Sequence, residues 1–254
     1  VDKKFIILRT DFNVPIIKGK IQDITRIDLC IPLIKNLLNK RAKLLLVSHL
    51  GRPKNRNEKE LSLSPIFEYL KQKLSEKIFF HTDKIDKETK KKISFLKESE
   101  VILFENIRFH EEENQNDEEF SKTLAGLGDV YINDAFSCSH REQSSIHKIV
   151  KFSKEYYAGP LMKKEIDAIN IVLNSKKKPV TCIIGGSKVS TKIAVLNSLI
   201  EKVDNIILVG AMANNFILYD GYKVGKSLIE NNSENIIKEI YKKSKLSKCN
   251  IFIP

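Results

Sequence analysis

The sequence predicts an α/β protein built on parallel sheets, and three observations favour this class. Short apolar runs alternate with longer amphipathic stretches, the runs show no polar alternation, and loops rich in Gly, Pro or charge separate them. Strands that are aliphatic on both faces are typical of parallel sheets covered by helices on each side. We therefore expect βα units in which every strand is followed by a loop and a helix.

The individual elements follow from local patterns. Residues 24–39 carry apolar side chains at helical spacing, and Ser64 before Pro65 is typical of an N-cap and the first residue of a helix. The predicted strands are 4–8, 43–47, 77–80, 101–104, 130–132, 180–184 and 206–209. The predicted helices are 24–39, one beginning at residue 64, 87–96, 117–124, 162–173, 189–199 and 234–244.

Residues 151–160 interrupt the strand and helix alternation with a Gly-Pro pair. Such a break is typical of a boundary between domains. We therefore expect a first domain over residues 1–155 and a second over residues 156–254.

Composition narrows the classes of function. The chain has 254 residues, 42% of them hydrophobic and 30% charged, with a net charge of +12. The positive charge comes mostly from lysines scattered along the chain, which argues against a nucleic-acid-binding protein. No apolar run is long enough to span a membrane. Four scattered cysteines indicate reduced thiols, so we expect a cytoplasmic protein.

In parallel sheets, ligands bind beyond the carboxyl ends of the strands, so the loops after the strands are the candidate sites. Asp11 and Asn13 follow the first strand and suit the hydroxyl groups of a small ligand, or else a simple Asx turn. His49 and Arg52 flank Gly51 after the second predicted strand. This loop suits a phosphate group, or else it is a solvated surface loop.

Two further loops carry an arginine, Arg108 after residues 101–104 and Arg141 after residues 130–132. Three basic loops at one sheet edge indicate an anion site. The alternative is that Glu105 and Asp134 neutralise the neighbouring arginines.

Gly185 and Gly186 end the strand at 180–184 and precede Lys188 and Lys192. This is neither of the common glycine-rich phosphate motifs. A Gly-Gly turn that opens a helix still offers backbone N–H groups to phosphate. With i, i+4 spacing, the two lysines would share one helical face, where they repel unless an anion lies between them. The alternative is two exposed lysines.

Together these loops resemble the phosphoglycerate kinase family. The resemblance rests on RTDFNVP at 9–15, SHLGRP at 48–53, ENIRF at 105–109, NDAF…HR at 133–141 and GGSKVSTKI at 185–193, in the family's order over nearly the whole chain. It implies two domains with parallel three-layer sheets. The implied reaction is reversible phosphoryl transfer between 1,3-bisphosphoglycerate with ADP and 3-phosphoglycerate with ATP.

The resemblance also implies residue roles. Asp11 and Asn13 would hold the glycerate part of the substrate, and Arg26 would face the transferring phosphoryl group. The cradle of the substrate 3-phosphate would consist of His49, Arg52, Arg108 and Arg141. Lys188 would stabilise the moving phosphoryl group as a catalytic residue beside Arg26. The nucleotide phosphates would meet Lys192 and the backbone of Gly185 and Gly186.

The family uses Mg²⁺ with ATP or ADP and is expected to be monomeric. The chain ends in a strand-like run, so the resemblance implies a truncated second domain without the later phosphate loop and without a magnesium ligand. A chain of this kind is expected to bind phosphoglycerate and to lack appreciable turnover. The alternatives are a non-catalytic phosphoglycerate-binding protein and a basic nucleic-acid-binding protein. Two local departures from the family pattern are Val209-Gly210-Ala211 and the run at 142–145.

Overall fold

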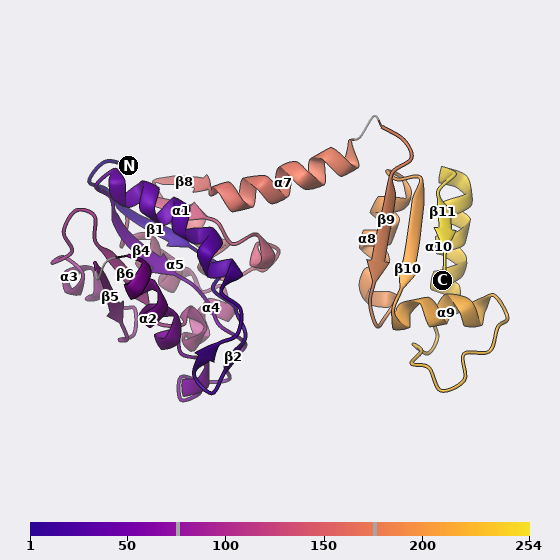
Figure 1. Ribbon diagram of the computed structural model, residues 1–254, viewed down its shortest axis with the longest axis horizontal. Helices are drawn as coiled ribbons and strands as arrows, with labels where there is room; N and C mark the ends of the chain where they lie inside the picture. Colours follow the sequence, from indigo (N-terminus) through magenta and orange to yellow (C-terminus); the bar gives the residue numbers. More distant parts are fainter. Residues whose placement is uncertain (75–76, 175–176) are drawn as a thin grey trace. The chain divides into compact units, whose positions relative to one another are not determined.

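The computed structural model describes residues 1–74, 77–174 and 177–254. The chain forms two compact units, Val1–Glu165 and Ile166–Pro254, and helix α7 (Pro160–Leu173) runs across the division (Figure 1). The boundary expected after residue 155 falls at the start of strand β8 (Glu155–Ala158). Because β8 pairs with β7, the first unit continues past that position.

The first unit is built on a six-stranded sheet in the order β5-β6-β4-β1-β7-β8. Every pairing in it is parallel, for example Ile7 opposite both Leu45 and Tyr131. The remaining strands are β1 (Phe5–Arg9), β4 (Lys43–Val47), β5 (Ile78–His81), β6 (Val101–Phe104) and β7 (Val130–Asn133).

Helices cover both faces of this sheet, as the aliphatic strands predict (Figure 1). Ile6 and Leu8 belong to one buried core, which also receives side chains of α1 (Thr25–Asn39) and α2 (Ser64–Lys73). Ile7 belongs to a second core on the opposite face, with side chains of α5 (Glu118–Ala125) and α6 (Lys148–Phe152). Shorter elements complete the unit: β2 (Ile16–Ile17), β3 (Lys20–Ile21), α3 (Thr89–Lys92), α4 (Glu111–Asn114), and the 3-10 turns η1 (Lys59–Leu61), η2 (Ile107–Phe109) and η3 (Phe136–Cys138).

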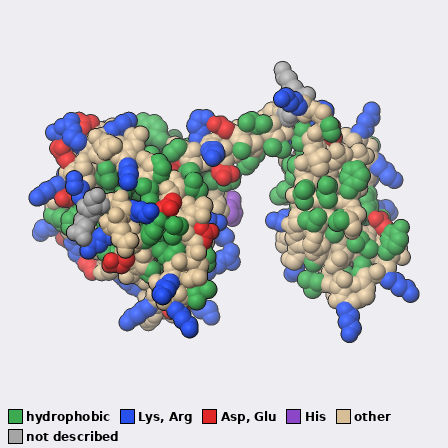
Figure 2. All heavy atoms as spheres, viewed as in Figure 1, with side chains coloured by type: hydrophobic (Ala, Val, Ile, Leu, Met, Phe, Trp, Pro, Cys, Tyr) green, Lys and Arg blue, Asp and Glu red, His purple; other side chains and the backbone are tan. Residues whose placement is uncertain are grey.

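The second unit contains a parallel sheet in the order β11-β10-β9, with β9 (Thr181–Gly185), β10 (Asn205–Val209) and β11 (Asn250–Phe252). Its helices α8 (Ile193–Ile200), α9 (Ala211–Tyr219) and α10 (Glu234–Ser247) share one core with Ile206 and Leu208 of β10. Ile183 of β9 and Phe252 of β11 alternate along their strands with residues that pack against this core, and they are 69% and 52% exposed. Figure 2 shows hydrophobic side chains on the visible face of this unit.

The predicted α/β class with parallel strands is confirmed, and each predicted strand lies within one residue of an observed one. Predicted helix 87–96 is wrong, because the helix spans only Thr89–Lys92. Beyond it, Ile93 and Leu96 are buried in the second core of the first unit. The sequence analysis also missed the hairpin β2–β3, the edge strand β8 and helix α9.

The role predicted for Ser64 is wrong as well. Ser64 is the first helical residue of α2, and Leu63 holds the N-cap position without a side-chain cap. The hydroxyl of Ser62 instead accepts the N–H of Ser64 at 3.1 Å, and Glu105 accepts the N–H of Leu63 at 2.8 Å. A carboxylate from the end of β6 therefore helps to start this helix.

No helix within residues 1–74, 77–174 and 177–254 combines the length and apolar character needed to cross a membrane.

Two leucines of the first unit provide a stability test. Leu46 in central strand β4 is fully buried, whereas Leu29 on α1 is 52% exposed. Leu46→Ala should lower the free energy of unfolding by about 2–5 kcal/mol, because it leaves a cavity between sheet and helices. Leu29→Ala, the matched control, should change it by less than about 0.5 kcal/mol. Urea unfolding followed by circular dichroism measures both, and equal losses would contradict the packing described.

Candidate functional site

A polar cavity lies in the first unit among the loops that follow its strands. Its volume is about 300 Å³. Because β1, β4, β6 and β7 run parallel, their carboxyl ends and the loops after them meet at one edge. The lining residues are Asn13, Arg26, His49, Gly51, Arg52, Arg108, Ser137, Cys138 and Arg141.

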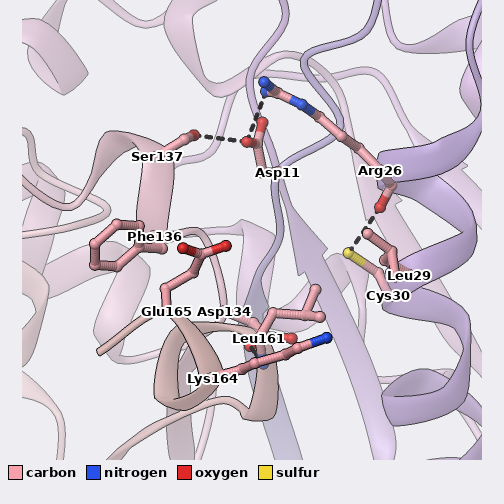
Figure 3. Close-up of a pocket in the computed structure, with 10 residues that line it drawn as sticks. All are labelled: Asp11, Arg26, Leu29, Cys30, Asp134, Phe136, Ser137, Leu161, Lys164 and Glu165. Atoms are coloured by element: carbon pink, nitrogen blue, oxygen red, sulfur yellow. Dashed lines mark hydrogen bonds and ion pairs between the residues drawn. The ribbon is translucent and has the colours of Figure 1, made fainter. Parts of the chain in front are cut away.

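Asp11 fixes the position of Arg26 at the rim. One carboxylate oxygen of Asp11 accepts hydrogen bonds from Arg26 Nη1 at 2.8 Å and from Ser137 Oγ at 2.6 Å (Figure 3). Its other oxygen accepts the N–H of Asn13 at 3.1 Å, which is the expected Asx turn. Arg26 remains half-exposed. The Asx turn therefore forms at a loop whose Asn13 lines the cavity.

Asp11, Arg26 and Ser137 also line a neighbouring pocket of about 350 Å³. Asp134 reaches it from the end of β7 (Figure 3). Oδ1 of Asp134 accepts the N–H groups of Leu161 and Met162, at 2.7 and 3.1 Å. This carboxylate therefore caps the start of α7.

The loop around Gly51 is tied to the loops on either side. Its N–H donates to Asn13 Oδ1 at 2.9 Å, and its carbonyl accepts Arg108 Nη1 at 2.7 Å. Gly51 has φ +58°, in the left-handed region that glycine adopts most easily. A second contact, from Arg108 Nη2 to Gln143 Oε1 at 3.2 Å, orients the guanidinium. Gln143 stands in the run that departs from the family pattern.

Asn106 organises the turn that carries Arg108. Its amide nitrogen donates to the carbonyls of Leu50 and Leu61, at 2.7 and 2.9 Å. Its amide oxygen accepts the N–H of Arg108 at 3.1 Å and that of Leu50 at 3.3 Å. Because Asn106 is fully buried, these four bonds satisfy backbone groups that water cannot reach.

The charged side chains that line the cavity are all arginines. Among the residues that the structure describes, no carboxylate lines it. Burial lowers the pKa of the Arg108 guanidinium, and the charges of Arg9 and Arg141 lower it further. The buried Nε of Arg108 has no hydrogen-bond partner in the described part of the chain. The cavity therefore has cationic donors in excess, which an anion would satisfy.

The expected alternative, in which Glu105 and Asp134 neutralise the arginines, is not what these carboxylates do. Glu105 accepts Ser62 Oγ at 2.7 Å and the N–H of Asn106 at 2.7 Å, in addition to Leu63. Asp134 binds the start of α7, as described above. Both carboxylates shape the surrounding backbone.

In the second unit, Gly185 ends β9 and Gly186 follows it. The side chain of Lys192 lies over Gly186, since a Cβ built there would be 3.7 Å from Lys192 Cε. The helix predicted over 189–199 begins later, at Ile193, after a 3-10 turn (Ser190–Lys192). Lys188 therefore precedes the helix, and the shared helical face predicted for the two lysines is wrong.

Glu230 holds the 3-10 turn before α8. Its carboxylate accepts the N–H of Ser190 at 3.1 Å and also binds the Ser190 hydroxyl. These bonds lower the pKa of the Glu230 carboxyl, the side-chain bond from Ser190 contributing most. The loop of Lys188 is thus attached to the segment after α9.

Three comparisons with known proteins relate this geometry to a family. The model of the phosphoglycerate kinase family matches residues 1–254. The chain belongs to the phosphoglycerate kinase family. It is 42% identical over 251 residues to the phosphoglycerate kinase of Wolbachia sp. subsp. Drosophila simulans, covering 99% of this chain and 63% of that protein. It is 39% identical over 255 residues to the Aquifex aeolicus phosphoglycerate kinase, covering 100% of this chain and 64% of that protein.

Solved structures of the phosphoglycerate kinase family agree. The structure of phosphoglycerate kinase from Coxiella burnetii has a TM-score of 0.85 at 35% identity and covers 100% of this chain. The Pyrococcus horikoshii structure has a TM-score of 0.80 at 29% identity and covers 99%. The chain spans about 63% of the length of the curated relatives it matches.

The structure brings together most of the residues that the family resemblance singles out. Six of the seven predicted substrate residues line the basic cavity, and the seventh, Asp11, accepts hydrogen bonds from three residues of its lining. The residues of the phosphoglycerate kinase pattern in the second unit, Gly185, Gly186 and Lys192, lie next to one another at the end of β9. Lys188 is exposed in the loop between Gly186 and the 3-10 turn Ser190–Lys192.

Sequence reasoning missed Arg9, Ser137 and Gln143. Arg9 is fully buried at the end of β1, which is rare for an arginine unless it has partners. An arginine that closes an aliphatic strand was the available signal. Ser137 and Gln143 contact site residues from loops far away in the sequence, so no local pattern indicates them.

Within the described residues, no group of three or more His, Cys, Asp or Glu side chains is placed so that it could hold a metal ion.

The role of Asn106 can be tested by substitution. Asn106→Ala should lower the free energy of unfolding by at least about 2 kcal/mol, because it leaves buried backbone groups of Leu50 and Leu61 without partners. The matched control is Asn36→Ala, at an exposed position of α1, with an expected change below about 0.5 kcal/mol. Urea unfolding measures both variants. A loss for Asn106→Ala no larger than that of the control would contradict the role of Asn106.

Proposed function

We propose that the first unit binds 3-phosphoglycerate or 1,3-bisphosphoglycerate in the basic cavity. We further propose that the protein acts with ATP or ADP in reversible phosphoryl transfer. The observation that carries the proposal is the cavity itself, which four arginines and a histidine line with no carboxylate among the described residues. Membership of the phosphoglycerate kinase family supports this choice of ligand. The proposed setting is the cytoplasm, and the proposed state is a monomer.

Residue roles follow from where the groups lie. Arg52, Arg108 and Arg141 would bind the 3-phosphate, and His49 would donate to the same group. Asn13 and Asp11 would hold the glycerate part. Planar guanidinium groups bind phosphate bidentately, which favours arginine over the far more abundant lysine here.

The chemistry requires positive charge more than a base. The acceptor in the proposed reaction is a carboxylate, so no proton has to be removed before it attacks. The barrier lies in bringing anions together and in stabilising the charge on the moving phosphoryl group. Arg26 suits that role because it reaches the rim and is held there by Asp11 while remaining half-exposed. Lys188 would contribute the same charge from the second unit.

The second unit would bind the nucleotide phosphates through Lys192 and the backbone of Gly185 and Gly186. Val209 lies close to this turn, since a Cβ on Gly185 would be 3.1 Å from Val209 Cγ2. In the family, magnesium accompanies the nucleotide and offsets its phosphate charge. The described side chains of this chain do not form a site for the ion, so no step of the proposal depends on it.

The basic surface offers a weaker case for nucleic acid. Lys and Arg side chains are spread around both units in the view of Figure 2, mixed with acidic ones. Nucleic-acid binding usually needs a basic stripe or patch on one face.

Calorimetric titration with 3-phosphoglycerate tests the cavity. Arg108→Ala should weaken binding more than about tenfold, because it removes a buried charged donor. The matched control is Arg41→Ala, since Arg41 precedes β4 at the opposite edge and pairs with Asp2. That variant should bind like the wild type. Equal affinities of the two variants would rule out the assigned cavity.

Arg26 should behave differently from the cradle arginines. Arg26→Ala should weaken binding of a non-hydrolysable bisphosphonate analogue of 1,3-bisphosphoglycerate about tenfold or more. Its effect on 3-phosphoglycerate should be small, because that ligand lacks the second phosphoryl group. Arg108→Ala should weaken both ligands alike. The proposed role of Arg26 fails if its variant affects both ligands equally.

A further inference from the structure

A buried chain of polar side chains lies behind the basic cavity. Glu113 of α4, Ser145 and Arg9 are all fully buried, and none of them lines the cavity. Glu113 accepts the Ser145 hydroxyl at 2.7 Å and the Ser145 N–H at 2.8 Å. Arg9 Nε donates to Ser145 Oγ at 2.9 Å. The carboxylate thus holds Arg9 through the serine.

Arg9 also contacts His49, which does line the cavity. Arg9 Nη2 lies 3.2 Å from His49 Nδ1, and Arg9 Nη1 donates to the carbonyl of Thr10 at 2.6 Å. A guanidinium group has only donors, so Nδ1 of His49 must be the acceptor. The ring proton then sits on Nε2, because the bond made by one ring nitrogen decides the state of the other.

The electrostatic surroundings favour the same state. Burial, together with the charges of Arg9, Arg108, Arg141 and Arg26, lowers the pKa of His49 to about 2, and burial contributes most. A histidine in this position is neutral at physiological pH. It therefore contributes to the cavity as a directed donor and adds no charge to the surrounding arginines.

We propose that Arg9 is a positioning residue that fixes His49 as its neutral Nε2–H tautomer, so that the ring donates one hydrogen bond to an anionic oxygen in the cavity. The identity of that anion as the phosphate of 3-phosphoglycerate rests on the proposed function. The tautomer itself does not. Arg9 acts from behind the ring and does not touch the ligand.

Nuclear magnetic resonance of the full chain with ¹⁵N-labelled histidine tests the tautomer directly. The variant His49→Gln identifies the His49 signals among those of the five histidines. The expected result is a proton on Nε2 and no titration between about pH 5.5 and 7.5, where an ordinary histidine changes charge. An Nδ1–H tautomer, or a ring that becomes cationic in this range, would overturn the proposal.

Two serine variants test the buried chain while keeping the buried Arg9 side chain in place. Ser145→Ala removes the link between Glu113 and Arg9, so the second His49 tautomer should appear and the ring should titrate at higher pH. The control is Ser144→Ala, a buried neighbour whose hydroxyl binds the carbonyls of Glu112 and Asp117. Its His49 signals should match the wild type. Wild-type signals in Ser145→Ala would overturn the positioning role.

Ligand binding completes the test. A glutamine at position 49 retains a neutral N–H near the place of Nε2, whereas an asparagine places it near Nδ1. The affinities for 3-phosphoglycerate and for inorganic phosphate are measured for both variants. The affinity of His49→Gln should stay within about threefold of the wild type, and that of His49→Asn should fall about tenfold or more. Equal losses would overturn the donor role. If the wild-type chain bound inorganic phosphate with the same affinity as 3-phosphoglycerate, the result would contradict the proposed function. The tautomer result would still stand.

Discussion

Repulsion between like charges at one sheet edge is the constraint on which the first unit depends. Several arginines converge on one cavity without a carboxylate in its described lining. Two of these arginines have partners that set their direction: Arg26 donates to Asp11 at the rim, and Arg108 donates to the carbonyl of Gly51. Behind the cavity, the chain from Glu113 through Ser145 holds Arg9. Each partner fixes a direction for a guanidinium and leaves the face toward the cavity unneutralised. An incoming anion would therefore meet donors that are already oriented.

The parallel sheet makes this arrangement possible. It gathers loops from β1, β4, β6 and β7 at one edge, and buried polar side chains then lock the loops together. Asn106 joins the Gly51 loop to the Arg108 turn, and Asn13 joins the first loop to Gly51. In the second unit, the carboxylate of Glu230 holds the turn before α8 in a similar way. The shape of the cavity thus depends partly on side chains, such as Asn106, that do not line it.

Much of the fold and of the candidate site could be predicted from the sequence. The aliphatic strands and the arginines that follow them indicate a parallel sheet and an anion site at its edge, and the five motifs indicate the family. What could not be predicted depends on distant contacts. Ser145 and Glu113 meet across 32 positions, and the helix expected over 87–96 ends at Lys92, before Ile93 and Leu96 of the buried core. The start of α2 was misplaced because Glu105, from another loop, supplies part of its cap.

The capping of α7 by Asp134 has a mechanical consequence. The loop after β7 carries Arg141, and the carboxylate at its start holds the first turn of the helix that leads out of the unit. Gly159 allows the close approach, since any Cβ there would lie 2.3 Å from Asp134 Oδ1. Asp134 therefore joins the loop that carries Arg141 to the first turn of α7, and a substitution at either Asp134 or Gly159 would disturb both segments.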